Sequence, residues 1–408
     1  MATIKEFRGL RPTPEAAPRV AELPYDVIDS PEARIIAGGN PDSYFHISKP
    51  EVDLPEAIDH YDRAVYEKGR DNLQEFIRRG TLFEEKEPLL YLYTLIMLGR
   101  AQTGLVACVS IDDYIQNRVK KHELTREDKE KDRSNHINIL SAQTGLVFLL
   151  YREDGSKKNL FQEAMKAAPL YDFTTPDGIG HTIRAITDPA LIASFKKSFR
   201  DVTLYIADGH HRAASSVNVG LERRKSHPAH RGDEEYNYFL SVIFPHDQLK
   251  ILPYNRVIRD LNNHTREEFL TRLGEKYQIQ KTDRDVPNGK GEICMYFNGD
   301  WYSLTPKFPV SDDAIESLDV KILQENVLAP LLNIQDPRKD KRIDFIGGIK
   351  GPGELKKLVD SGQYAVAFSL FPTSVEDLIR VSDSGGIMPP KSTWFEPKLR
   401  SGFITHLI

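Results

Sequence analysis

Short runs of apolar, strand-forming residues mark the middle of the chain. The runs 89–98, 103–111, 146–151 and 202–207 are rich in β-branched and aromatic side chains and are bounded by turn residues, which predicts four strands. A helix is predicted near 189–199, before the last strand. The small residues 213–216 predict another helix after it. We interpret residues 88–250 as a core built on these strands.

The pattern changes on both sides of this core. Residues 1–87 begin with an extended, proline-containing stretch, and their apolar residues then recur near every 3.6 positions over 55–80, which predicts a helix. Residues 251–387 run as strand, helix, two strands, helix (314–332) and strand, an order typical of ferredoxin-like domains. The last segment, 388–408, is predicted to be an ordered tail. The expected fold class is therefore α+β.

Composition and charge narrow the class of protein. The chain has 408 residues, of which 40% are hydrophobic and 28% charged, as in an ordinary globular protein with two or three domains. Its net charge of −5 makes nucleic acid an unlikely partner, since proteins that coat nucleic acid carry a basic excess. Two cysteines exclude a disulfide framework. Without a signal-peptide pattern or a run of about 20 apolar residues, we expect a cytoplasmic protein that does not contact a membrane.

The most informative stretch is the 208–212 turn, Asp208-Gly209-His210-His211-Arg212, where an apolar strand passes into a helix. A glycine allows a tight turn, and the free N–H groups at a helix start favour a phosphate. Arg212 can donate to phosphate oxygens, and His210 and His211 add imidazole donors or acid–base groups. Asp208 is a candidate ligand for Mg²⁺. A plain capped turn with two hydrogen-bonded histidines is the alternative.

A second candidate is the charged stretch 120–136, whose composition predicts a helix. His122 is a candidate substrate contact, and Glu123 beside a phosphate site is a candidate general base toward a hydroxyl group. On a helix, Lys129 and Arg133 would share a face and form a phosphate or nucleotide clamp. A solvated helix of alternating charges is the alternative.

Two weaker candidates lie near the ends of the chain. Tyr25 and Asp26 follow a proline and are candidate substrate contacts, although a buried turn explains them equally well. Lys391, in Lys391-Ser392-Thr393, is a candidate phosphate contact, but no glycine pattern of a P-loop precedes it.

Four separated motifs together resemble the bacterial and archaeal family known as domain of unknown function 1015. They lie at 20–28, at 122–125 with 131–133, at 207–212 and at 388–393. The middle of the chain is also similar to the ParB/sulfiredoxin superfamily, in which a turn of this kind binds nucleotide phosphates and which includes free serine kinases. This resemblance implies phosphate- and metal-side roles for Asp208, His210, His211 and Arg212, and a base role for Glu123. Because His210 stands where a sulfiredoxin has its reactive cysteine, sulfinic acid reduction is excluded.

The expected function is transfer of a phosphoryl group to or from a small hydroxylated metabolite. By resemblance the metabolite is L-serine, and the activity is that of a kinase or of the reverse, phosphatase-type reaction. The donor would be a nucleotide or pyrophosphate, with Mg²⁺ as cofactor. Two alternatives stay open: a metal-dependent hydrolase or nuclease that uses His122, Glu123, Asp208 and His210, and a nucleotide-dependent DNA-binding switch protein like ParB. The C-terminal segment is a candidate dimer interface, so a homodimer is a further expectation.

Overall fold

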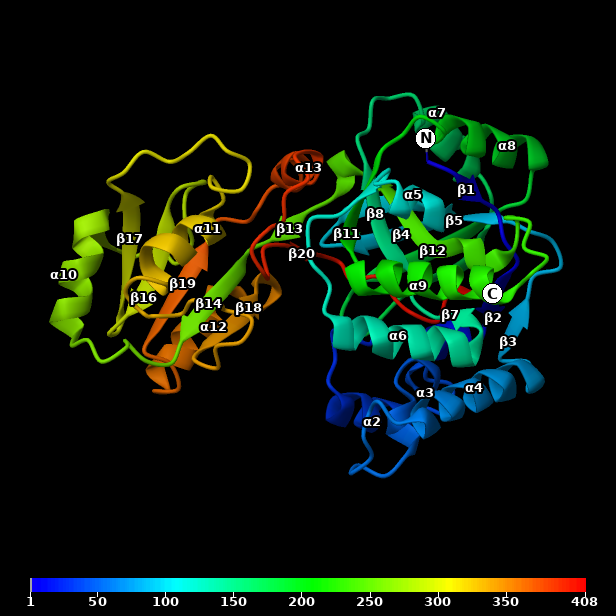
Figure 1. Cartoon of the computed structure of the whole chain (residues 1–408), viewed down its shortest axis with the longest axis horizontal. Coiled ribbons are helices and arrows are strands. Elements are labelled where there is room, and N and C mark those ends of the chain that lie inside the picture. The colour runs from blue at the N-terminus through cyan, green and yellow to red at the C-terminus, as the bar shows by residue number, and fades with distance from the viewer. Residues whose placement is uncertain (1) are drawn as a thin grey trace. The chain divides into compact units, whose positions relative to one another are not determined.

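The computed structural model describes residues 2–408 and divides the chain into two compact units. The first unit runs to Leu249 and takes up the chain again at Pro397–Ile408, and the second unit is Lys250–Glu396. Both units combine helices and strands (Figure 1), so the predicted mixed α+β class is confirmed. The ParB/sulfiredoxin-like core and the ferredoxin-like segment stay predictions.

The first unit is built on a nine-stranded sheet with the order β6-β11-β8-β12-β5-β4-β10-β9, in which β1 also pairs with β5. Its strands are β1 (Ile4–Lys5), β4 (Leu90–Met97), β5 (Arg100–Ser110), β6 (Val119–Lys120), β8 (Val147–Tyr151), β9 (Pro169–Thr174), β10 (Gly180–Ile186), β11 (Leu204–Asp208) and β12 (Tyr238–Pro245). Strand β11 is buried between β6, to which it is parallel, and β8, to which it is antiparallel. Its apolar residues explain its burial, and the four predicted strands are confirmed.

Helices α7, α8 and α9 supply apolar side chains to the same core as the sheet. Phe161, Phe195 and Val217 from these helices cluster with Leu149 and Ile206 from the strands. Helix α6 packs against both α9 and α4 (Figure 1). The helices of this unit are α1 (Ala17–Val20), α2 (Ser30–Gly38), α3 (Phe45–Ser48), α4 (Arg63–Arg78), α5 (Ile111–Ile115), α6 (Glu127–Leu140), α7 (Lys158–Ala164), α8 (Pro189–Ser198) and α9 (His210–Ser226), with 3₁₀ turns η1 (Pro50–Asp53), η2 (Glu235–Asn237) and η3 (His246–Gln248).

A small four-stranded sheet joins both ends of the chain to the first unit. Its order is β3 (Leu82–Glu84), β2 (Gly9–Pro12), β21 (Thr405–Leu407) and β7 (Ala142–Gln143). A second apolar cluster, which includes Tyr44, Leu73 and Phe76, packs beneath it. The last residues of the chain are therefore structural parts of this unit.

The second unit contains a six-stranded antiparallel sheet with the order β15-β17-β16-β19-β14-β18. Its elements are β13 (Ile251–Leu252), β14 (Tyr254–Ile258), α10 (Arg266–Lys276), β15 (Tyr277–Thr282), β16 (Ile293–Phe297), β17 (Asp300–Pro306), α11 (Asp319–Leu323), the π-helix η4 (Gln324–Leu328), β18 (Ile343–Gly347), η5 (Gly348–Lys350), α12 (Gly351–Asp360), β19 (Val366–Leu370), α13 (Val375–Asp383) and β20 (Trp394–Phe395). Strands β13 and β20 pair where the chain enters and leaves the unit.

Three predicted helices differ from the observed ones at their ends. The helix expected over 314–332 is confined to α11 and the π-helix, because the Asp313 carboxylate accepts the N–H groups of Ile315 and Glu316 and holds a turn there. Helix α4 begins at residue 63, where the Asp62 side chain caps it. The helix expected from residue 120 begins only at Glu127, which leaves residues 121–126 as a loop.

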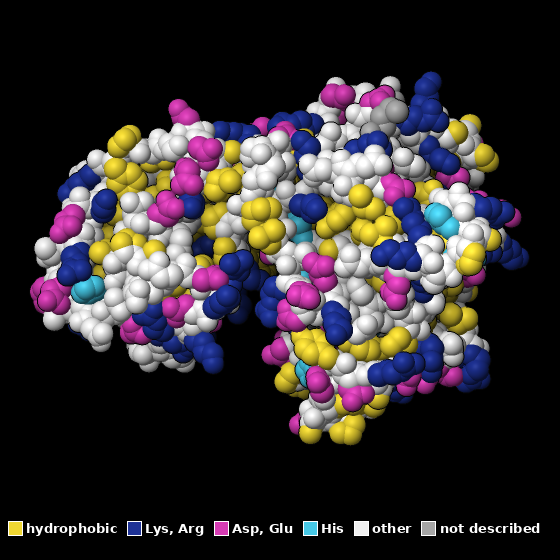
Figure 2. Space-filling model, viewed as in Figure 1, with side chains coloured by type: hydrophobic (Ala, Val, Ile, Leu, Met, Phe, Trp, Pro, Cys, Tyr) yellow, Lys and Arg dark blue, Asp and Glu magenta, His cyan; other side chains and the backbone are white. Residues whose placement is uncertain are grey.

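The surface and the helices add two further observations. Figure 2 shows basic and acidic side chains interspersed over the visible face of each unit, without a single large basic area. Among residues 2–408, no helix combines the length and the apolar character that a membrane crossing requires.

Candidate functional site

Two neighbouring parallel strands bring the two candidate stretches together. Strands β6 and β11 pair in parallel, with Leu204 opposite Val119 and Tyr205 opposite Lys120. Because parallel strands end at the same edge of a sheet, the loop after β6 and the 208–212 turn after β11 leave the sheet side by side. His122 and Glu123 thereby meet Asp208 and His210, although more than 80 residues separate them in the sequence.

The 208–212 turn forms an open start to a long helix. Gly209 has φ +92° and precedes the first residue of α9, and no side chain of the described residues caps this end. A Cβ atom at Gly209 would lie 3.1 Å from Cζ of Arg212, so the guanidinium lies directly over the glycine. Uncapped N–H groups and the positive end of the helix dipole favour an anion here.

Arg212 is the central cation of the site and is only 7% exposed. One guanidinium nitrogen donates to the Leu146 carbonyl, and Nη2 lies 3.3 Å from Oδ2 of Asp26 and 3.5 Å from Oδ2 of Asp208. Burial alone would lower the Arg212 pKa, but these two carboxylates raise it above its ordinary value. Its Nε has no hydrogen-bond partner among the described residues, so one donor of a buried cation is unused.

Asp208 stays ionised despite its position at the end of a buried strand. Nζ of Lys398 lies 3.6 Å from Oδ2 of Asp208, and the Gly209 N–H donates to Oδ1 over 3.0 Å. Burial would raise the Asp208 pKa, but Lys398 and Arg212 hold it well below its ordinary value. Lys398 is a site residue that the sequence analysis missed, because no recognisable motif surrounds it and only the return of the chain to the first unit brings it here.

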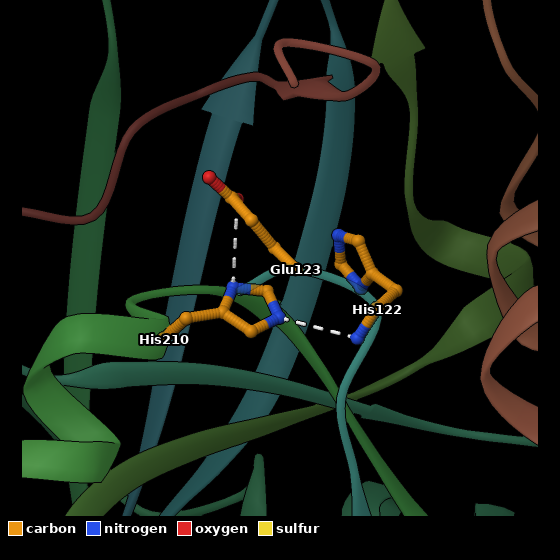
Figure 3. A group of neighbouring side chains, drawn as sticks. All are labelled: His122, Glu123 and His210. Carbon is orange, nitrogen blue, oxygen red and sulfur yellow. Dashed lines mark hydrogen bonds and ion pairs between the residues drawn. The ribbon is translucent and has the colours of Figure 1, made fainter. Parts of the chain in front are cut away.

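His122, Glu123 and His210 form a compact group at the same edge (Figure 3). Nδ1 of His210 lies 3.8 Å from Oε2 of Glu123, and the rings of His122 and His210 meet edge to face with centroids 4.5 Å apart. The His122 backbone N–H donates to Nε2 of His210 over 3.5 Å, so the His210 proton resides on Nδ1 and faces Glu123. Both ring nitrogens of His122 are buried without a hydrogen-bond partner in the described chain.

The histidines of the site are neutral near pH 7. Burial lowers the pKa of His122 to about 4, and burial together with the nearby His122 lowers the pKa of His210 well below its ordinary value. Burial also lowers the pKa of His211, whose Nε2 accepts the Arg126 backbone N–H over 3.1 Å. Neutral imidazoles offer lone pairs, so the group can accept a proton or bind a metal ion.

Two different sets of donors are available for a cation. One potential ligand atom each from His122, Glu123 and His210 lies within 4.8 Å of the others, a nitrogen-rich set that suits Zn²⁺ and similar ions. Asp208 and Asp26 instead offer partly exposed carboxylate oxygens, which are the ligands that Mg²⁺ prefers. Both carboxylates are paired with Arg212 in the structure, and the Mg²⁺ stays a prediction.

The remaining predicted residues separate into two groups. The guanidinium of Arg133 stacks over the Tyr25 ring, 4.2 Å from its centroid, and both residues line a pocket that also includes Arg212. Lys129 is not among the residues that line this pocket, and its Nζ instead lies 3.1 Å from the Tyr61 hydroxyl. Lys391 belongs to the second unit, where its ammonium group lies over the ring of Tyr254.

Comparison with known proteins gives the following likenesses. The model of a family described as "Protein of unknown function (DUF1015)" matches residues 4–321. Among solved structures, free serine kinase in complex with AMP is similar at 12% identity and a TM-score of 0.37, over 73% of this chain and 91% of that one. SbnI with a C-terminal truncation from Staphylococcus aureus is similar at 11% identity and a TM-score of 0.39, over 74% and 87% of the two chains. A conserved hypothetical protein from Pyrococcus furiosus is similar at 12% identity and a TM-score of 0.36, over 74% and 95%. No curated protein matches the chain.

Proposed function

The chain belongs to the DUF1015 family, and from its site we propose that it is a phosphotransferase acting on a small hydroxylated metabolite. The observation that carries this proposal is the uncapped start of α9 with buried Arg212 lying over Gly209. Backbone N–H groups, the helix dipole and a guanidinium then converge on one place, where they bind the oxygens of a transferable phosphate. The unused Nε–H of Arg212 supports a ligand that accepts hydrogen bonds.

Glu123 is the base in this proposal. Its side chain is 46% exposed, which lets it reach a bound molecule, and it lies beside the proton on Nδ1 of His210. Glu123 takes the proton of the acceptor hydroxyl while the new bond from oxygen to phosphorus forms and the bond from phosphorus to the donor's bridging oxygen breaks. Nδ1 of the neutral His210 lies 3.8 Å from this carboxylate. By resemblance L-serine is the first acceptor to test, and phosphoserine is the substrate of the reverse reaction.

A Mg²⁺ ion would be held by Asp208 and Asp26, the partly exposed carboxylates on either side of Arg212. When bound, such an ion neutralises charge on the donor's phosphates. Arg212 and Lys398, which both lie near Asp208 at the turn, stabilise the negative charge of the transferred phosphoryl group.

Phosphorus NMR tests the proposal directly. The full chain is incubated with Mg²⁺, L-serine and ATP, ADP or pyrophosphate in turn, and in parallel with phosphoserine alone. We expect a phosphomonoester signal to appear with one donor, or the phosphoserine signal to disappear. No change with any donor, in the presence of L-serine or of a mixture of small alcohols, would refute the phosphotransferase proposal.

Replacing the base gives the matched comparison. Glu123→Gln keeps the size of the side chain but removes its proton-accepting charge, so we expect the turnover rate to fall by about 10²- to 10⁴-fold while donor binding is retained. Glu127→Gln, an exposed carboxylate four residues later, is the control and should keep the activity of the unmodified chain. Equal rates for the two variants would remove Glu123 from the mechanism.

The nitrogen-rich group of Figure 3 favours a second candidate, a metal-dependent hydrolase. In that case Glu123 binds the ion and activates water through it, so it is no longer the free base of a phosphotransferase. Elemental analysis of the purified chain separates the two candidates. A stoichiometric transition metal that is lost in His122→Ala supports the hydrolase, and activity with Mg²⁺ in metal-free protein supports the phosphotransferase.

A further inference from the structure

A pocket beside the 208–212 turn has two cations in its wall. It is partly open to solvent, and its polar lining includes Tyr25, Ser48, Arg133, His136 and Arg212. None of the described residues that line it is acidic. The charged groups among these lining residues are guanidinium groups, which can donate hydrogen bonds to an anion.

Both guanidinium groups are held in fixed positions. Arg133 stacks on Tyr25, donates from Nε to Oδ2 of Asp132 over 2.9 Å, and donates from Nη1 to the Ser48 carbonyl over 3.4 Å. Arg212 is oriented by Asp26 and the turn, as described above. The carboxylates that pair with the two arginines do not line the pocket, so they orient the cations without occupying it.

The pocket also contains a donor that has no acceptor. The Ser48 hydroxyl is buried and unpartnered in the described chain, and Ser48 is only 2% exposed. Leaving a buried donor unsatisfied costs free energy, which a bound acceptor would recover. His136 adds no charge, because its Nε2 donates to the Ile47 carbonyl over 2.9 Å and burial lowers its pKa to about 4.

We infer that this pocket binds the carboxylate of the acceptor, so that the substrate is a small hydroxy acid and not a neutral alcohol. The inference rests on the proposed function and deepens it. Arg212 is shared between the pocket and the turn, which places the acid group next to the transferred phosphate. Arg133 forms the second contact, and a guanidinium binds a carboxylate, as it does a phosphate, with two parallel hydrogen bonds.

Calorimetric titration of the full chain without nucleotide tests the pocket separately from catalysis. D-glycerate and L-serine are the acids, and glycerol and serinamide are their counterparts without the carboxylate. We expect at least one acid to bind about tenfold more tightly than its counterpart. Equal binding within both pairs, or no binding of either acid, would overturn the inference.

Variants identify the residues that make the contact. Arg133→Gln should weaken acid binding about tenfold or more, Arg133→Lys should weaken it less, and Lys131→Gln, an exposed residue of the same helix, should leave it unchanged. Ser48→Ala tests the pocket with a variant that should fold normally. The Ser48 hydroxyl has no partner among the described residues, so the melting temperature should be unchanged or raised while acid binding weakens about threefold. Acid binding that is unchanged in both Arg133→Gln and Ser48→Ala would refute the pocket.

Three further outcomes separate this inference from the proposed function. If ADP or pyrophosphate binding weakens in Arg133→Gln as strongly as acid binding does, the pocket holds a donor phosphate and the inference is wrong. If phosphoryl transfer proceeds equally well to glycerol and to glycerate, the inference is wrong while the phosphotransferase proposal stands. If the acids bind and Arg133→Gln weakens them but no transfer occurs with any donor, the pocket is supported and the proposed function falls.

Discussion

At the scale of single residues, the site is a balance of buried charges. Arg212 and Lys398 face Asp26 and Asp208 at 3.3 to 3.6 Å, so the site without a ligand is close to neutral. Such pairing keeps each charged group ionised in a partly buried place, since removal of one partner would leave the other charge without compensation. In the proposed function, a phosphate bound at the turn adds negative charge, which Arg212 and Lys398 would neutralise.

Lys398 allows a test of this balance without altering the turn itself. Lys398→Gln removes one of two cations near Asp208, so we expect ADP to bind about three- to tenfold more weakly and the Asp208 pKa to rise. Lys196→Gln is the matched control, because Lys196, on α8, forms a comparable ion pair with Glu6. Calorimetric titration with ADP measures the difference, and equal affinities in the two variants would exclude Lys398 from the anion site.

At the scale of elements, strand β11, the 208–212 turn and helix α9 form one continuous unit, to which the proposed function assigns the phosphate. The sequence pattern predicted this unit in its correct place, because an apolar strand followed by Asp-Gly and small helix-forming residues has few other ways to fold. It did not predict the loop of residues 121–126, since the charged composition there resembles a solvated helix. Nor did composition show that Lys129 and Arg133 have different partners.

A substitution at Gly209 tests how the conformation of the 208–212 turn affects stability and phosphate binding. At φ +92° a Cβ is strained, so Gly209→Ala should destabilise the chain by about 1 kcal/mol or more. It should also displace Arg212, whose Cζ would lie 3.1 Å from the new atom, and so weaken phosphate binding. The measurements are thermal unfolding and titration with ADP.

Gly232 provides the control for strain alone. It has φ +95° and open space where a Cβ would lie, so Gly232→Ala should lose a similar amount of stability without any change in ADP affinity. If both variants bind ADP as the unmodified chain does, Arg212 is not part of the binding site.

At the scale of the whole molecule, buried neutral histidines make stability depend on pH. Burial lowers the pKa of His122 and His136 to about 4 and that of His181 to about 3, against an ordinary value of 6.5. Between these values and 6.5 the unfolded chain binds more protons than the folded chain, so stability rises with pH and is lost as the pH falls below 6.5. Each histidine contributes up to about 1.4 kcal/mol per pH unit. Calorimetric melting temperatures should therefore fall steadily from pH 7 to pH 5.

Glu22 makes the opposite contribution to the pH dependence of stability and serves as an internal control. Burial raises its pKa to about 7 from 4.5, so the folded chain binds the extra proton and this contribution is lost as the pH rises from 4.5 toward 7. Glu22→Gln removes the opposing contribution and keeps an acceptor for the Ser43 hydroxyl, which should make the acid loss of stability steeper. A melting temperature that is constant or higher at pH 5 would contradict the assignment of neutral buried histidines.

The sequence by itself determined the local features of this protein. It determined the apolar strands, the turn with its glycine and arginine, the mixed α+β class and the family, because strand and turn propensities act over a few neighbouring residues and the motifs are contiguous. Only the tertiary structure decided which distant groups share the site. The parallel pairing of β6 with β11 brings Glu123 to His210, and the return of the chain from the second unit brings Lys398 to Asp208. These contacts depend on sheet order and chain path, which short-range patterns in a single sequence do not encode.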